Sequence, residues 1–124
     1  MNSDFRNLDV YNIARELRKE IFELIKVFPS EERYQLSNQL LRASRSITAN
    51  IAEGYGRFHY KDNIRFCRLA RGSLYETLEH LITAFDCNYI DEETFLKFEE
   101  KVTMIMKKLN GYISYLKNKN HLTT

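Results

Sequence analysis

Apolar residues recur along this chain at alternating steps of three and four, which places them on one face of an α-helix. The single proline and two of the four glycines lie where such a pattern stops: Pro29 follows the first stretch, and Gly54 and Gly56 follow the second. The pattern predicts helices and no strand, and the four helical stretches cover about residues 8–27, 30–54, 60–87 and 91–117.

Two of these stretches begin with residues suited to a helix N-terminus. Ser30 is expected to be the N-cap of the second helix, with Glu31 and Glu32 in its first turn, where the helix dipole favours carboxylates. The acidic run 91–93 is expected to open the fourth helix in the same way. Residues 118–124 are expected to fray.

Short connections make neighbouring helices antiparallel, and the three–four spacing is typical of near-parallel helix packing. A chain of 124 residues is long enough to bury a core of its own. We therefore predict an all-α fold, an up-down-up-down antiparallel four-helix bundle. It forms a single domain over residues 1–124 with an ordered core of about residues 5–117.

Several apolar residues lie beside the main stripes, and the chain has eight tyrosines, whose rings are favoured at interfaces. A monomer with broad helix faces could cover these residues. We favour the alternative, a homo-oligomer that buries them between subunits. The surplus apolar residues are Val10, Ile13, Phe22, Ile64, Phe66 and Leu69.

Polar residues interrupt the second helix, where Asn50 and Glu53 lie close to positions that a bundle core fills with apolar side chains. A buried polar group needs a hydrogen-bond partner. We interpret the two as a buried, hydrogen-bonded pair that fixes the packing of the bundle. The alternative is that both line a ligand site.

Glycines and an arginine complete this polar motif. Gly54 and Gly56 are interpreted as the break that ends the helix, with Arg57 directly after them, and Gly72 as a point of close helix approach. Because no strand precedes Gly54-x-Gly56 and no third glycine follows it, a phosphate-binding loop is excluded.

The net charge of +2 is unevenly distributed. Residues 31–72 hold eight basic and four acidic side chains, a balance of +4, whereas residues 1–30 are neutral and residues 73–124 have a balance of −2. Basic residues on the second and third helices could merge into a patch that contacts several phosphates. The alternative is a solvated face whose cations pair with Glu53, Glu76 or Glu79 of a neighbouring subunit. The candidate nucleic-acid-binding residues are Arg42, Arg45, Lys61, Arg65, Arg68 and Arg71.

No constellation typical of an enzyme is present. A di-iron bundle needs two Glu-x-x-His pairs, and no acidic residue stands three positions before His59, His80 or His121. A Ser–His–Asp site has no nucleophile elbow to support it. We expect no catalysis, no cofactor and no metal.

Cysteine use and hydropathy indicate the compartment. Cys67 and Cys87 lie 20 residues apart on one predicted helix, about 30 Å at 1.5 Å per residue, so they cannot form a disulfide with each other. Free thiols fit a reducing compartment. No apolar run reaches the roughly 18 residues of a membrane span, and the first residues do not form a signal peptide. We expect a cytoplasmic protein with no membrane partner.

Four runs of residues carry a resemblance to a known family. They are Phe5-Arg6-x-Leu8-x-Val10-Tyr11, Phe28-Pro29-x-Glu31-Glu32-Arg33-Tyr34, the segment from Leu40 to Arg57 around Asn50-Ile51-Ala52-Glu53-Gly54, and Phe66-x-x-x-Ala70-x-Gly72-Ser73-Leu74-x-Glu76. From Phe5 to about Lys117 the chain resembles the bacterial four-helix-bundle proteins associated with intervening sequences of 23S ribosomal RNA genes, also described as S23 ribosomal protein-like.

The resemblance implies a closed bundle that assembles into a homo-oligomeric ring, a pentamer. The family is similar in fold to accessory proteins of diversity-generating retroelements, which bind a reverse transcriptase and nucleic acid. No catalytic residues are known for the 23S intervening-sequence family. The leading hypothesis is a non-enzymatic accessory module that binds RNA or DNA. The alternative is a protein-interaction scaffold whose partner is encoded nearby.

Overall fold

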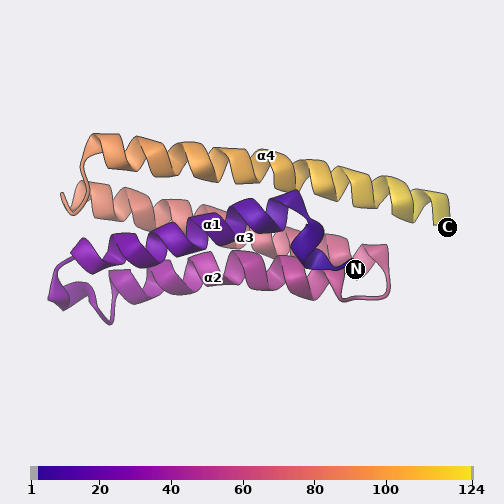
Figure 1. Cartoon of the computed structure of the whole chain (residues 1–124), viewed down its shortest axis with the longest axis horizontal. Coiled ribbons are helices and arrows are strands. Elements are labelled where there is room, and N and C mark those ends of the chain that lie inside the picture. The colour runs from indigo at the N-terminus through magenta and orange to yellow at the C-terminus, as the bar shows by residue number, and fades with distance from the viewer. Residues whose placement is uncertain (1–2, 124) are drawn as a thin grey trace.

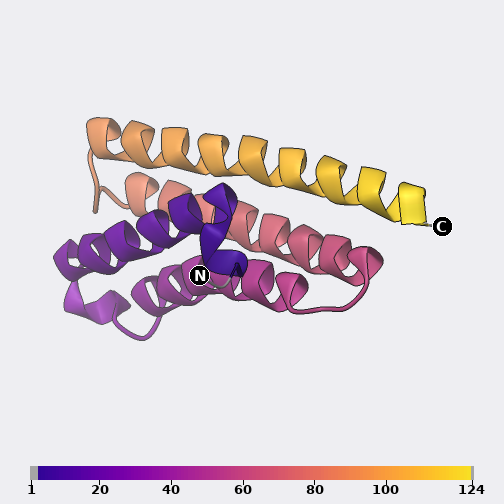
Figure 2. The ribbon, with the colours of Figure 1, turned by 45° about the vertical axis from the view of Figure 1, so that its right-hand side comes forward.

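Four long helices form the chain, α1 (Asp9–Leu24), α2 (Leu36–Tyr55), α3 (Tyr60–Asp86) and α4 (Glu92–Thr123). The computed structural model describes residues 3–123, and over that range it contains no strand. Successive helices run antiparallel, and α4 extends past the others at its C-terminal end (Figures 1 and 2). The predicted all-α four-helix bundle is confirmed.

The predicted stripes form the core. Val10 and Ile64, which we expected beside the stripes, belong to this core, with 3% and 6% of their surface exposed. Phe22 and Leu69, at 44% and 48%, do remain exposed. The large side chains that are almost completely buried include Leu17, Ile21, Leu40, Ile47, Ile51, Leu74, Leu81, Ile105, Leu109 and Leu116.

The start of the second helix differs from the prediction. Ser30 is not its N-cap, because the chain forms a separate 3-10 turn over Ser30–Glu32, and α2 begins only at Leu36. The Glu32 carboxylate accepts the backbone N–H of Leu36 at 3.3 Å and the hydroxyl of Tyr89 at 2.8 Å. This hydrogen bond to a carboxylate is the main reason why the pKa of Tyr89 rises to about 12. Glu32 therefore accepts a hydrogen bond from the first residue of α2, one turn after the predicted start. Through Tyr89 it also links this N-terminus to the α3–α4 connection.

The C-terminal end of α4 also differs. Residues 118–123, expected to fray, continue the helix, and Thr124 lies outside the described residues. Ile113 and Leu116 anchor this part of the helix in the core, at 3% and 2% exposure. One turn further on, the Lys119 ammonium lies over the Tyr115 ring, 5.7 Å from its centroid. The Lys119 contact lies beyond Leu116, the last position of the predicted apolar stripe.

Gly54 and Gly72 play different parts from those expected, whereas Gly56 ends the second helix as predicted. Gly54 lies within α2, and a Cβ there would come within 2.6 Å of the Asn63 Oδ1 atom and 2.9 Å of Phe66 Cβ. Gly54 therefore allows α3 to approach α2 closely, and Gly56 is the C-cap. Gly72 is exposed, and a Cβ on it would have no described neighbour within 4 Å, so it mediates no close approach within the chain.

This geometry predicts opposite effects for two matched substitutions. Gly54→Ala should lower the free energy of unfolding by about 1–3 kcal/mol, because the added methyl group overpacks the α2–α3 contact. The control Gly72→Ala adds the same atom to an open helix position and should raise it by roughly 0.5–1 kcal/mol. Urea unfolding followed by circular dichroism measures both, and a Gly54→Ala protein as stable as the wild type would contradict the close contact.

Candidate nucleic-acid interface

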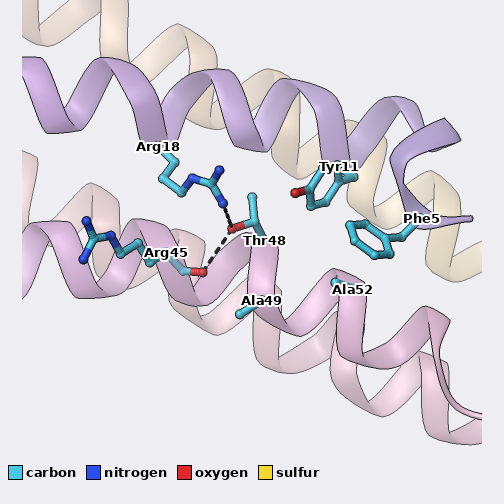
Figure 3. Close-up of a pocket in the computed structure, with 7 residues that line it drawn as sticks. All are labelled: Phe5, Tyr11, Arg18, Arg45, Thr48, Ala49 and Ala52. Carbon is cyan, nitrogen blue, oxygen red and sulfur yellow. Dashed lines mark hydrogen bonds between the residues drawn. The ribbon is translucent and has the colours of Figure 1, made fainter.

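A groove runs along the bundle between α1 and α2. Its main hollow has a volume of about 470 Å3 (Figure 3). The lining residues come from both helices and from the N-terminal 3-10 turn, Phe5–Asn7. They are Phe5, Tyr11, Arg18, Arg45, Thr48, Ala49 and Ala52.

Hydrogen bonds hold the arginine of α1 against α2. Arg18 Nη1 donates to Thr48 Oγ1 at 3.0 Å, and the Thr48 hydroxyl donates to the backbone oxygen of Arg45 at 3.1 Å (Figure 3). Thr48 is only 2% exposed, and its bond to the preceding turn satisfies the hydroxyl there. The Arg18 guanidinium is therefore held in place by α2.

The groove is electropositive. In the described part of the chain, no carboxylate lines the main hollow. A second hollow of about 270 Å3 shares Arg18 and Arg45 and adds Lys19 and Glu23. The Glu23 carboxylate already pairs with Lys26 at 3.0 Å. Two arginines thus line both adjoining hollows, and guanidinium groups are suited to binding phosphate oxygens.

Arg18 was not predicted as a site residue. Residues 1–30 have no net charge, so nothing in that segment marked one arginine. Two features of the sequence could have indicated it. Arg18 directly follows the core residue Leu17, and it stands seven residues after Tyr11, so that both lie on the same flank of α1. Recognising that this flank faces α2 required the fold.

The six predicted basic residues do not gather on one face. Arg42 and Arg45 are exposed on α2, and Arg45 also lines the groove. Arg71 lies on the other side of the bundle, where its Nη1 donates to Asn110 Oδ1 of α4 at 2.8 Å. Steps of three residues fall about 60° short of a full helical turn, so from Arg65 to Arg71 the side-chain direction rotates by about 120°. Arg71 is therefore not part of one patch with the residues of the groove, and the merging of the other five residues stays a prediction.

The other three predicted cations lie exposed on α3: Lys61, Arg65 and Arg68. The Arg65 guanidinium carbon lies 4.5 Å from the centroid of the Phe66 ring. The guanidinium carbon of Arg57, which lies between α2 and α3, is 4.7 Å from the same centroid. Within residues 3–121, none of the six predicted residues forms an ion pair. Their charges are therefore not neutralised within the chain.

Asn50 and Glu53 do not form the predicted buried pair. Asn50 is half-buried, and its Nδ2 donates to the backbone oxygen and Oγ of Ser46 at 2.9 and 3.0 Å. Glu53 is exposed and pairs with Arg57 at 2.8 Å. The prediction is wrong because the two side chains turn in opposite directions along the helix. Neither lines the main hollow, although Glu53, Gly56 and Arg57 line a shallower one beside it.

A different residue is the buried polar link between helices. Asn63 of α3 is 7% exposed, donates to the Tyr112 hydroxyl of α4 at 3.1 Å, and accepts from the Cys67 thiol at 3.5 Å. Burial raises the pKa of Cys67 to about 11, so this thiol stays protonated at neutral pH. Asn63 was not predicted as a buried polar residue.

Two alanine substitutions separate these assignments. Asn63→Ala should lower the free energy of unfolding by about 1–3 kcal/mol, because it leaves the half-buried Tyr112 hydroxyl without its partner. Glu53→Ala removes an exposed i,i+4 ion pair and should cost no more than about 0.5 kcal/mol. Thermal or urea unfolding of both proteins makes the comparison. A larger loss for Glu53→Ala than for Asn63→Ala would restore the buried-pair interpretation.

The fold defines a class, the small antiparallel four-helix-bundle proteins. The chain belongs to the family described as 23S rRNA-intervening sequence protein, whose model matches residues 6–111. A crystal structure at 1.70 Å of a protein with unknown function, from the S23 ribosomal protein family of Bacteroides thetaiotaomicron VPI-5482, is similar. The two chains are 28% identical with a TM-score of 0.78, over 85% of this chain and 95% of the other. No curated protein matches the chain.

The family resemblance found in the sequence is thus confirmed. Among the helices of residues 3–123, none has both the length and the apolar character that crossing a membrane requires.

Proposed function

We propose that this protein is a non-enzymatic, cytoplasmic accessory module that binds RNA or DNA through phosphate contacts centred on the α1–α2 groove. The observation that carries the proposal is the arginine pair, Arg18 and Arg45. Arg18 and Arg45 line both hollows of the groove, and the larger hollow is lined by no described carboxylate. Guanidinium groups bind phosphate oxygens through two parallel hydrogen bonds.

The exposed side of α2 supports the same interface. Ala49 and Ala52 lead from the groove to a hollow of about 470 Å3 that is also lined by Gly56, Arg57 and Glu53, whose carboxylate pairs with Arg57. Small side chains let a phosphate backbone approach the helix closely, and Arg42 adds an exposed cation on the same helix. Contacts of this kind position a nucleic acid without reading its bases, so the expected binding is weak, salt-dependent and without sequence preference.

Assembly would multiply these contacts. We propose a homo-oligomeric ring, a pentamer by the family resemblance, in which each copy presents one groove. Exposed apolar residues outside the groove, among them Leu69, Leu96 and Met104 at 48–49% exposure, are available to subunit contacts. A ring would add weak contacts through avidity. If nucleic acid is not bound, a protein-interaction scaffold is the alternative.

A charge reversal on α2 tests the interface. Arg42→Glu/Arg45→Glu should weaken binding to a labelled 20-base-pair RNA duplex at least tenfold near 50 mM salt, because it replaces two phosphate-facing cations with carboxylates. Both residues are exposed, so the fold should persist. Lys97→Glu/Lys107→Glu is the matched control, since it changes the net charge equally on exposed positions of α4. Fluorescence anisotropy measures the affinities.

Three results would count against this interface. If the wild-type protein does not bind nucleic acid near 50 mM salt, the protein-interaction scaffold replaces the proposed function. If the control protein loses as much affinity as the α2 variant, the effect is one of net charge and not of this interface. Binding that survives the α2 reversal but is abolished in Arg65→Glu/Arg68→Glu would place the interface on α3.

The assembly has its own test. Light scattering at tens of micromolar should give a molar mass of about five times the 14.8 kDa of one chain. The physical reason is the exposed apolar area, whose burial between subunits is favourable. A mass of 14.8 kDa would contradict the oligomer, and another integer multiple would contradict the pentamer alone.

A further inference from the structure

A second cavity lies at the end of the bundle where α2 passes into α3. Its volume is about 550 Å3, within the roughly 300–1,000 Å3 typical of ligand sites. Four tyrosines, a phenylalanine and a histidine line it, drawn from α2, the α2–α3 turn, α3 and the C-terminal half of α4. The cavity is therefore built from flat rings.

Two of these rings are more than half exposed. Phe58 in the turn is 94% exposed, and Tyr115 of α4 is 53% exposed. Tyr112 stacks on Tyr115 with 6.2 Å between ring centroids and 12° between planes. The hydrogen bond from Asn63 holds the Tyr112 hydroxyl in place. A flat ligand would thus meet, in Tyr112, a ring whose position is already set, at little cost in ordering it.

Cations surround the rings. Arg57 lines the cavity, and the Lys119 ammonium lies over the Tyr115 ring. Within the described residues, no carboxylate lines the cavity. Glu53, the nearest acidic neighbour along α2, is paired with Arg57. Aromatic faces combined with flanking cations are the means by which proteins hold single-stranded nucleic acids.

The cavity also continues the α1–α2 groove. Ala49 and Ala52 line both the groove and the shallow hollow beside it, and Arg57 lines both that hollow and the aromatic cavity. From Arg45 to Gly56 this path follows α2 for about 16 Å at 1.5 Å per residue. A strand whose phosphates meet Arg18 and Arg45 could therefore place a base a few nucleotides away among the rings.

We propose that this aromatic cavity binds an unpaired nucleobase, so that the protein prefers single strands or duplex ends with unpaired bases. The inference rests on the proposed nucleic-acid function, but it concerns a different chemistry, base stacking rather than phosphate binding. Bases inside a duplex are stacked on one another and cannot enter. The cavity distinguishes unpaired from paired nucleic acid without reading sequence.

A fluorescent reporter tests the contact directly. The chain has no tryptophan, so Phe58→Trp introduces a single indole at the cavity, and Tyr75→Trp provides a matched reporter at an exposed position of α3. Excess ten-nucleotide oligothymidine should quench the indole at position 58 and leave that at position 75 unchanged. An abasic strand of the same length, which keeps the phosphates and lacks the bases, should quench neither.

Affinity gives the second measurement. Phe58→Ala/Tyr115→Ala should weaken oligothymidine binding about tenfold, the loss expected from a base that stacks on an aromatic side chain. Tyr75→Ala is the control. Binding of a blunt RNA duplex and of the abasic strand should change less than twofold in both proteins, because neither supplies an unpaired base.

Each other outcome has one meaning. Equal wild-type affinity for oligothymidine and the abasic strand, without quenching, overturns the base site and leaves the groove intact. Failure of every nucleic acid to bind ends the proposed function and this inference with it. An indole emission at position 58 that shifts with protein concentration, with no oligonucleotide present, assigns the cavity to a second copy of the chain and contradicts the proposal.

Discussion

The close approach of α2 and α3 at Gly54 is the contact on which the rest of the structure depends. A side chain at this position would collide with Asn63 and Phe66, so a residue without a Cβ is needed for these helices to pack at this distance. Further along the same seam, the hydroxyl groups of Ser46 and Ser73 are 2.8 Å apart in a hydrogen bond. Small residues and a hydroxyl pair thus join the two helices.

The candidate surfaces follow from that seam. Because Gly54 brings Asn63 against α2, the Asn63 amide reaches Tyr112 across the bundle and places α4 beside the α2–α3 turn. The aromatic cavity forms where these three elements meet. On its other flank, α2 buries Thr48 and leaves Arg45 exposed, so Arg18 of α1 completes the electropositive groove. One helix therefore supplies residues to both sites.

The sequence was sufficient for the helices because their apolar spacing is a local property. The bounds of α3 differ from the prediction by one residue. The late start of α2 could not be predicted, because Glu32 caps Leu36 in an arrangement completed by Tyr89, 57 residues further on. The extension of α4 to residue 123 was not predicted, because residues 117–121 are all polar and continue no apolar stripe.

The candidate site was less accessible from the sequence. Counting charges identified Arg42 and Arg45, but whether cations on different helices share a face depends on the rotation of each helix. Arg18 was missed and Arg71 misplaced for this reason. The buried polar pair was expected at Asn50 and Glu53 because polar residues stood near a core stripe. The buried link is Asn63 with Tyr112, a contact between residues 49 positions apart.

The salt dependence of binding tests most directly the claim that α2 contacts phosphates. Removal of one cation that binds a phosphate reduces the slope of log affinity against log salt concentration by about one. For a duplex RNA measured between about 50 and 200 mM salt, Arg42→Ala/Arg45→Ala should reduce the wild-type slope by about two, and Lys97→Ala/Lys107→Ala should leave it unchanged. An unchanged slope in the α2 variant, or an equal decrease in both, would contradict the account.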